Sequence, residues 1–195
     1  MRLIKKLYGW VLRWADTPYA APALFLLAFS ESSFFPVPPD VLLITLALSI
    51  PKKSFRYAFI CTAGSVIGGI LGYYIGQYGY EVIGKPIVEF YHGQQIMAGI
   101  KTKYDLYGFW GILIAAITPI PYKIFTIASG VFDFNFIGFV SASVIGRAFR
   151  FFIVAGLIWK FGPSIKNFID KYFNLLTFVF FGLLILGFII LKYVL

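Results

Sequence analysis

The chain has 195 residues, of which 60% are hydrophobic and only 13% are charged. A soluble domain is about 45–50% apolar and about 25% charged, and a globule of this length has too little interior for the excess. The composition therefore argues against a soluble fold and excludes a disordered chain, and it predicts an integral membrane protein. In so apolar a chain, the formal net charge of +9 indicates Lys and Arg at membrane ends rather than a nucleic-acid surface.

Residues 1–16 combine apolar residues at helical spacing with basic residues between them. Trp10 and Trp14 lie on the apolar side of this pattern, and Lys5 and Lys6 lie on the other side. Trp and Lys in this arrangement are typical of a helix that lies in the membrane interface. The charges also interrupt the apolar core that a signal peptide needs. We therefore expect an N-terminal interfacial helix.

Residues 19–50 are apolar except at the stretch 31–40, which reads ESSFFPVPPD. Pro36, Pro38 and Pro39 remove backbone donors and forbid a continuous helix. Each half has roughly a dozen residues, or ~20 Å of helix, whereas the hydrocarbon core is ~30 Å thick. Because neither half spans the membrane alone, the segment predicts a re-entrant hairpin whose broken backbone is covered by protein or faces water.

Residues 55–79 are long and apolar enough for a transmembrane helix. Gly64, Gly68, Gly72 and Gly76 recur at every fourth position and therefore share one helix face. A stripe of small residues lets another backbone approach closely. We expect this face to be the main packing surface of the span.

The same theme recurs after a polar stretch. Charged residues return over 80–107, where we expect an interfacial connector. The apolar segment 108–131 is broken at Pro119 and Pro121, which predicts a second re-entrant hairpin. Residues 134–160 then form a second full span.

The C-terminal segment 163–195 contains an apolar run, residues 173–191, without any charge. This run predicts an extra transmembrane helix that faces lipid. The whole sequence has one Cys and one His, so we expect no internal disulfide, no metal centre and no cofactor.

The two halves of the chain correspond when they are offset by 83 residues, which places Pro36–Asp40 on Pro119–Lys123. Each half, 19–79 and 108–162, is a broken hairpin followed by one full span. A hairpin returns to its own side and a span changes sides, so the two repeats enter the membrane from opposite faces. Inverted repeats with broken helices that meet near the midplane are an architecture of secondary transporters, whose site lies at the junction.

The distribution of basic residues predicts the orientation. With the N-terminus in the cytoplasm, ten of the 17 Lys and Arg residues lie inside, four lie outside and three lie within the membrane. An excess of Lys and Arg marks the cytoplasmic side. We therefore predict a single membrane domain over 1–195: a multi-pass, all-α integral membrane protein with two inverted repeats, an N-terminal interfacial helix and an extra C-terminal transmembrane helix.

Five ionisable residues fall in segments that we expect in the hydrocarbon: Glu31, Asp40, Lys123, Arg147 and Arg150. Each costs ~2.5–3.5 kcal/mol at the bilayer centre on insertion scales. Such residues normally pair with one another or face a wet cavity, and they are functional-site candidates by default.

Asp40 and Lys123 occupy equivalent positions in the two repeats and carry opposite charges, so they are candidates for an ion pair. Each begins a half-helix. An acid suits the positive end of a helix dipole, and the alternative for Asp40 is therefore a capping role alone. A Lys at such an end adds to the positive potential and makes a local anion site, or alternatively extends toward the membrane surface.

Arg147 and Arg150 are three residues apart and share a helix face. Arg binds phosphate in a planar, two-pronged way, which makes this pair a candidate phosphate site. The alternative is a set of buried ion pairs with Glu31 or Asp40 that only stabilises the fold. Glu31 alternatively carries a proton, since burial and a nearby Arg shift the pKa of a carboxyl in opposing directions.

The combination of Glu31 with the two proline breaks, the glycine-rich span and the dipeptide Gly146-Arg147 resembles the DedA family. Its domain is also called the VTT or SNARE-associated Golgi protein domain. The resemblance covers about residues 18–162, and the composition is similar to that of the small YqaA-like branch. It implies two facing re-entrant hairpins and the movement of polyprenyl phosphate or phospholipid between leaflets, often coupled to the proton motive force.

The resemblance also implies roles for individual residues. The functional acids of the first hairpin match Glu31 and Asp40. Lys123 stands where the family usually has Arg after the second proline break, and the Arg usual just before that break is absent. Arg147 and Arg150 are then the residues that would supply this charge from the following span.

We therefore expect a lipid transporter or flippase, not an enzyme, in the bacterial cytoplasmic (inner) membrane. Lys123, Arg147 and Arg150 would hold a phosphate-bearing headgroup, and Glu31 and Asp40 would release it by competing for the same cations. The expected partners are membrane lipids and not nucleic acid, and assembly into a homo-oligomer stays open. A small-solute or ion transporter and a non-transporting scaffold are the alternatives. An enzyme would need a nucleophile with a positioned base, which the sequence does not show.

Overall fold

The computed structural model describes residues 19–34, 38–90, 92, 94–162, 164 and 182. Every element that it describes is a helix, which confirms the prediction of an all-α chain over this part. The predicted interfacial helix at 1–16, the proline at position 36 and all but two residues of the predicted C-terminal segment 163–195 lie outside the described residues.

The helices follow one another with short connections. In chain order they are α2 (Ala20–Ser33), α3 (Asp40–Ser49), η1 (Pro51–Lys53), α4 (Ser54–Gly79), η2 (Tyr80–Gly84), α5 (Lys85–Phe90), α6 (Gln94–Ile117), α7 (Tyr122–Val131) and a last helix, Phe136–Gly162. The segment predicted as a connector over 80–107 consists of η2, α5 and the first part of α6.

Two of these helices are long and apolar enough to cross a membrane. The first is the continuous run Pro51–Gly84, with 34 residues, and the second is Phe136–Gly162, with 27 residues. At 1.5 Å per residue they are about 50 and about 40 Å long. They run antiparallel and pack side by side, and the ring of Phe55 lies 6.2 Å from Phe152 and 5.8 Å from Trp159.

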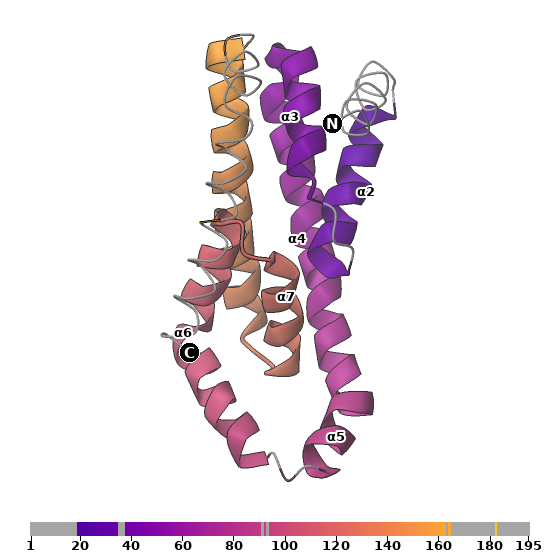
Figure 1. Ribbon diagram of the computed structural model, residues 1–195, viewed down its shortest axis with the longest axis vertical. Helices are drawn as coiled ribbons and strands as arrows, with labels where there is room; N and C mark the ends of the chain where they lie inside the picture. Colours follow the sequence, from indigo (N-terminus) through magenta and orange to yellow (C-terminus); the bar gives the residue numbers. More distant parts are fainter. Residues whose placement is uncertain are drawn as a thin grey trace.

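Both predicted proline breaks interrupt a helix. The first break follows Ser33, and the helix resumes after Pro38 and Pro39 at Asp40. Figure 1 shows that α2 descends from one end of the molecule to about mid-height and that α3 returns to the same end. These helices have 14 and 10 residues, or about 21 and 15 Å, which is shorter than a ~30 Å hydrocarbon core.

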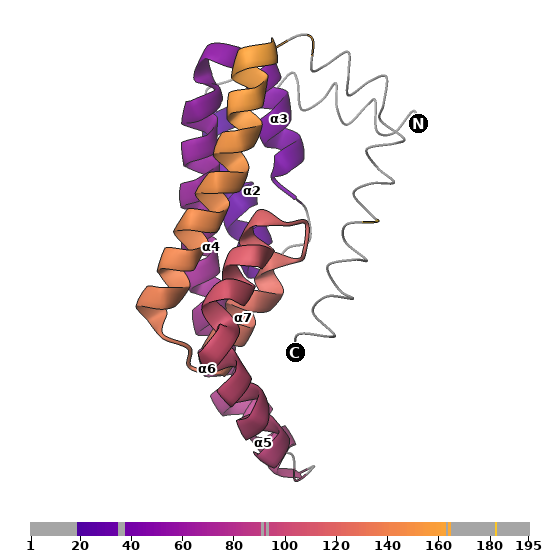
Figure 2. The same ribbon diagram turned by 90° about the vertical axis from the view of Figure 1, so that its left-hand side faces the viewer.

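The second break lies between Ile117 and Tyr122 and contains Pro119 and Pro121. Here α6 rises from the opposite end of the molecule to mid-height, and α7 turns back toward that end (Figure 1). In the perpendicular view of Figure 2, the α2–α3 pair again occupies the upper half of the molecule, and α7 lies below it. The two breaks therefore approach each other from opposite ends.

The glycine stripe of α4 is the surface on which one helix of each pair packs, α2 from the first and α7 from the second. A Cβ added at Gly68 would fall on the backbone of Phe29 in α2. A Cβ added at Gly76 would fall on the backbone of Ile127 in α7. Gly64 likewise faces α2. The first half of the stripe thus holds α2 and the second half holds α7, so that α4 fixes the position of one pair relative to the other.

A tight turn joins α7 to the last helix. Asp133 adopts a positive φ of 52°, which a short polar side chain tolerates. The side chain of Asn135 accepts a hydrogen bond of 2.7 Å from the backbone N–H of Gly138 and so caps the start of the last helix. This cap fixes where the long helix begins, and with it the height at which Arg147 and Arg150 lie.

Candidate functional site

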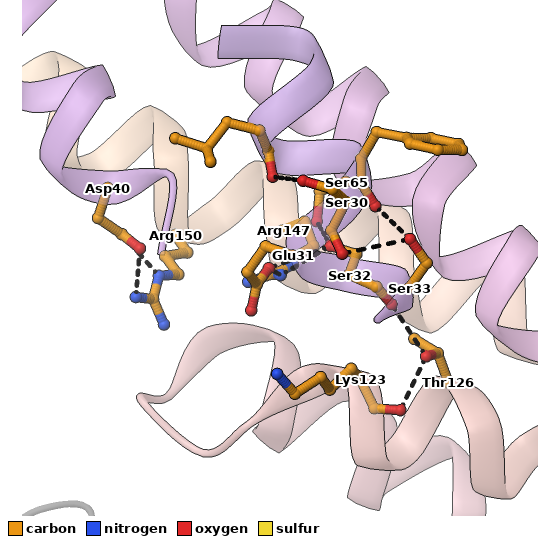
Figure 3. Close-up of polar contacts among 12 residues, drawn as sticks. Ser30, Glu31, Ser32, Ser33, Asp40, Ser65, Lys123, Thr126, Arg147 and Arg150 are labelled. Carbon is orange, nitrogen blue, oxygen red and sulfur yellow. Dashed lines mark hydrogen bonds and ion pairs between the residues drawn. The ribbon is translucent and has the colours of Figure 1, made fainter. Parts of the chain in front are cut away.

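Glu31 and Arg147 form a buried ion pair between α2 and the last helix (Figure 3). Nη2 of Arg147 donates to Oε2 of Glu31, and the side chains are only 3% and 15% exposed. Ser32 reinforces the pair, because its Oγ accepts from the same nitrogen at 3.0 Å and donates to Oε2 of Glu31 at 3.2 Å. Ser32 Oγ also lies 2.6 Å from Oγ of Ser65 on α4. Three helices are therefore joined at this pair.

Two aromatic rings enclose the guanidinium of Arg147. Its Cζ lies 4.3 Å from the ring centroid of Tyr122, the first residue of α7, and 5.4 Å from that of Phe151. Such cation–π contacts stabilise a cation that has lost its water. The Nε atom of Arg147 is buried and has no hydrogen-bond partner among the described residues. The environment of this cation is thus largely dry and still holds one unsatisfied donor.

A second ion pair joins the two proline breaks. Nε and Nη2 of Arg150 donate to the two carboxylate oxygens of Asp40 at 3.0 and 2.8 Å. The remaining terminal nitrogen, Nη1, donates to the backbone carbonyl of Thr118 at 2.6 Å. Asp40 begins α3 directly after the first break, and Thr118 begins the second break. One guanidinium therefore links the turning points of both helix pairs.

The two ion pairs differ in exposure. The side chains of Arg150 and Asp40 are 18% and 20% exposed, whereas that of Arg147 is almost completely buried. A charge pair that keeps some contact with solvent exchanges partners at lower cost than a dry one, because less of its hydration is lost. The pair at Asp40 is thus the more accessible of the two.

The helix pairs also contact each other directly through one hydrogen bond. Oγ1 of Thr126 in α7 lies 3.0 Å from the backbone carbonyl of Ser32 at the end of α2, and 2.9 Å from the carbonyl of Lys123. Ser32 contacts the Glu31–Arg147 pair through its side chain and α7 through its carbonyl. This residue is therefore the point at which α2, α7 and the buried ion pair meet.

Lys123, in the first turn of α7, is the fifth charged residue of the cluster. Its side chain is partly buried, and none of the ion pairs found among the described residues includes it. Figure 3 shows its side chain extended below the two ion pairs. The three cations and two carboxylates of this cluster have a formal net charge of +1, and the excess positive charge is assigned to Lys123 because each carboxylate is paired with an Arg.

The five charged residues predicted from the sequence do lie together, but one of the suggested ion pairs is wrong. Asp40 pairs with Arg150 and not with Lys123. Arg147 and Arg150 share a helix face as expected, and a separate carboxylate neutralises each of them. Over the described residues, no group of three or more His, Cys, Asp and Glu side chains is arranged to hold a metal ion.

Sequence reasoning passed over several residues of the site, among them Ser65, Tyr122 and Thr126. Ser65 is a small polar residue beside the glycine stripe, where polar side chains bond between helices. Thr126 follows Lys123 by three positions and therefore lies on the same side of α7. These spacings were visible, but the contacts depend on how the helices are rotated against each other, which a single sequence does not specify.

Comparisons with known proteins place the chain in a family. The VTT domain matches residues 37–160, which include Pro38 and Pro39 of the first break, the whole second break, α4 and both arginines. An uncharacterized protein of Haemophilus influenzae is 34% identical over 174 residues, which are 87% of this chain and 90% of that protein. A homologue of it from Histophilus somni is 32% identical over 174 residues, or 87% of this chain and 91% of its own length. An uncharacterized protein of Methanocaldococcus jannaschii is 28% identical over 134 residues, or 68% of this chain and 79% of its own length. No solved structure matches the chain.

The two long apolar helices, and the charge pairs that join the last helix to α2 and α3, are typical of an all-helical membrane protein over the described residues. The chain belongs to the VTT domain, or DedA, family. The resemblance seen in the proline breaks and in the Gly146-Arg147 dipeptide is thereby confirmed.

Proposed function

We propose that this protein moves a lipid with an anionic, phosphate-bearing headgroup, either a polyprenyl phosphate or a phospholipid, between the two leaflets of a membrane. The observation that carries the proposal is the charged cluster at the meeting point of the two helix breaks, in which cations outnumber carboxylates. Charges inside hydrocarbon are costly and normally mark an ion or substrate pathway. An excess cation at such a place favours an anionic cargo.

The proposal includes a placement in the membrane. Pro51–Gly84 and Phe136–Gly162 cross the bilayer, and the α2–α3 and α6–α7 pairs enter it from opposite faces as inverted, re-entrant repeats. The lengths of α2, α3 and α7 and the opposite directions of the two pairs support this placement. Broken backbone at membrane depth is tolerated where protein covers it, and here Arg150 bonds the free carbonyl of Thr118. The N-terminus lies in the cytoplasm of a bacterial cell, and the protein is in the cytoplasmic (inner) membrane.

The transport step follows from competition for the same cations. A headgroup phosphate enters the cluster while its acyl chains stay in lipid. It first contacts Lys123, which has no carboxylate partner among the described residues. It then takes the place of Asp40 at Arg150, the more exposed of the two pairs, and next that of Glu31 at Arg147. The return of Asp40 to Arg150 releases the phosphate. Protonation of Asp40 would favour binding, because a neutral carboxyl competes less well for the guanidinium. No covalent bond changes in this cycle.

Reconstituted vesicles test the proposal. Purified protein is placed in vesicles that carry a trace of a fluorescent anionic phospholipid, and the loss of fluorescence to a membrane-impermeant quencher reports exchange between leaflets. We expect exchange with the wild type and its loss in Lys123→Gln and Arg147→Gln. Lys52→Gln is the matched control, because Lys52 is an exposed lysine in η1. Undiminished exchange in both site variants would remove the phosphate site.

A non-transporting scaffold is the second candidate, and the deep burial of the Glu31–Arg147 pair favours it. Buried ion pairs can often be replaced by apolar residues of similar volume without loss of stability. The double variant Glu31→Leu, Arg147→Met separates the candidates if it folds like the wild type. If the protein is a transporter, this variant should lose both lipid exchange and the cellular function of the protein. If it is a scaffold, the variant should keep that cellular function.

A further inference from the structure

We infer that the cluster selects its lipid by charge balance: the wild type prefers a phosphodiester headgroup with one negative charge over a phosphomonoester and over a zwitterion. This inference rests on the proposed lipid exchange and narrows its substrate class to phospholipids with a diester headgroup, because a polyprenyl phosphate is a phosphomonoester. It assigns the selection to Lys123, because Lys123 is the cation of the cluster that has no carboxylate partner among the described residues.

The first step is that the arginines contribute little net charge. Asp40 occupies two nitrogens of Arg150 in the two-point geometry, and the third nitrogen bonds Thr118. Glu31 is bonded to Arg147, whose guanidinium also lies against two aromatic rings. Each pair is formally neutral, and a phosphate that replaces a carboxylate at one Arg leaves that carboxylate in the same cluster. The charge that the headgroup must match is therefore the sum over the cluster.

The second step is the charge of the headgroup. The formal sum over the cluster is +1, because Lys123 adds one positive charge to two neutral pairs. A phosphodiester has a charge of −1 and makes the loaded cluster neutral. A phosphomonoester has about −1.5 to −2 near pH 7 and leaves an excess negative charge. A zwitterionic headgroup leaves the excess positive charge in place.

The third step is the cost of an imbalance. In surroundings of low polarity, charges several ångströms apart interact strongly. One unit charge that is not neutralised therefore changes the binding affinity of the headgroup by more than about tenfold. Part of the cluster is almost completely buried, so water screens the imbalance poorly. Selection by net charge is therefore strong enough to measure as a difference in exchange rate.

The experiment uses full-length protein in vesicles and three fluorescent lipids with identical acyl chains: phosphatidylcholine, phosphatidylglycerol and phosphatidic acid. The wild type, whose cluster has a formal charge of +1, should exchange phosphatidylglycerol about tenfold faster than the other two lipids. Lys123→Gln lowers the sum to zero and should move the preference to phosphatidylcholine. Asp40→Asn raises it to +2 and should move the preference to phosphatidic acid, while the amide oxygen can still accept from Arg150.

Lys52→Gln removes the same charge from an exposed position and should leave the wild-type preference unchanged. If Asp40→Asn does not fold, Lys123→Gln alone decides the matter, because it leaves no carboxylate without its Arg. Equal rates for the three lipids in the wild type, or a preference that stays the same in Lys123→Gln, would overturn charge selection while leaving transport intact. A wild type that moves none of the three lipids would instead overturn the movement of phospholipids by this protein, and charge selection with it.

Discussion

Arg150 holds both carboxylate oxygens of Asp40, which lies 110 residues earlier in the sequence. The same guanidinium also donates to the carbonyl of Thr118. Asp40 and Thr118 border different helix breaks, so one side chain connects the turning points of both helix pairs. A lysine offers a point charge and cannot supply three donors in this fixed plane, which is why Arg is the residue that the position requires.

We therefore predict that Arg150→Lys and Arg150→Gln both lower stability. Removing one partner of a buried pair costs about 3–5 kcal/mol, and we expect about 2–3 kcal/mol here because both side chains keep some exposure. The measurement is the free energy of unfolding in detergent. Asp40→Asn completes a double-mutant cycle, and additive effects of the two substitutions would show that the pair contributes nothing. The control is Glu81→Gln, because Glu81 forms a surface ion pair with Lys85 at 3.7 Å, in which the side chains are 63% and 54% exposed. This substitution should change stability by less than about 1 kcal/mol.

The glycine stripe gives a second prediction. Gly68→Ala and Gly76→Ala place a Cβ on the backbone of α2 or of α7, and backbone has no rotamer with which to move away. Overpacking of this kind typically costs about 1–3 kcal/mol. Gly79→Ala is the matched control, because a Cβ there meets nothing within 4 Å and the residue is helical. That control should gain about 0.5–1 kcal/mol, since Ala favours a helix more than Gly does. Relative to the wild type, the thermal unfolding temperature should therefore fall in Gly68→Ala and Gly76→Ala and rise in Gly79→Ala.

A third prediction concerns the contact between the two helix pairs. Thr126→Val keeps the shape of the side chain and removes the donor to the carbonyl of Ser32. Interhelical hydrogen bonds in membrane proteins contribute about 0.6–2 kcal/mol, so we expect a loss in that range. Thr126→Ser retains the hydroxyl and should recover most of it. A Thr126→Val variant as stable as the wild type would show that the hydrogen bond contributes nothing.

Much of the fold could be predicted because it is encoded locally. Prolines at positions 38, 39, 119 and 121 interrupt helices wherever the chain places them, and an apolar run of sufficient length gives a long helix in any packing. The period of four in the glycines likewise depends on helix geometry alone. These features place the two breaks and the two long helices before any contact between them is known.

The pairing within the site could not be predicted in the same way. Symmetry of the two repeats suggested that Asp40 would meet Lys123, but Asp40 meets Arg150. Which cation reaches Asp40 depends on the rotation and height of the last helix, which the cap at Asn135 and the packing against Phe55 determine. Ser65 was missed for the same reason, because its partner Ser32 is identified only when α2 is placed on α4.

The orientation in the membrane gives the last prediction. Lys53 and Lys85 are exposed and lie on either side of the run α4–η2, so they should face the cytoplasm and the outside, respectively. Lys85→Cys should react with a membrane-impermeant maleimide on intact cells, whereas Lys53→Cys should react only after the cells are permeabilised. The native Cys61 is buried and should give little background, which the parent protein measures directly. Labelling in the reverse order would invert the orientation but keep the crossing. Reaction of both variants from the same side would show that α4 does not cross the bilayer, and the inverted arrangement of the two helix pairs would then be wrong.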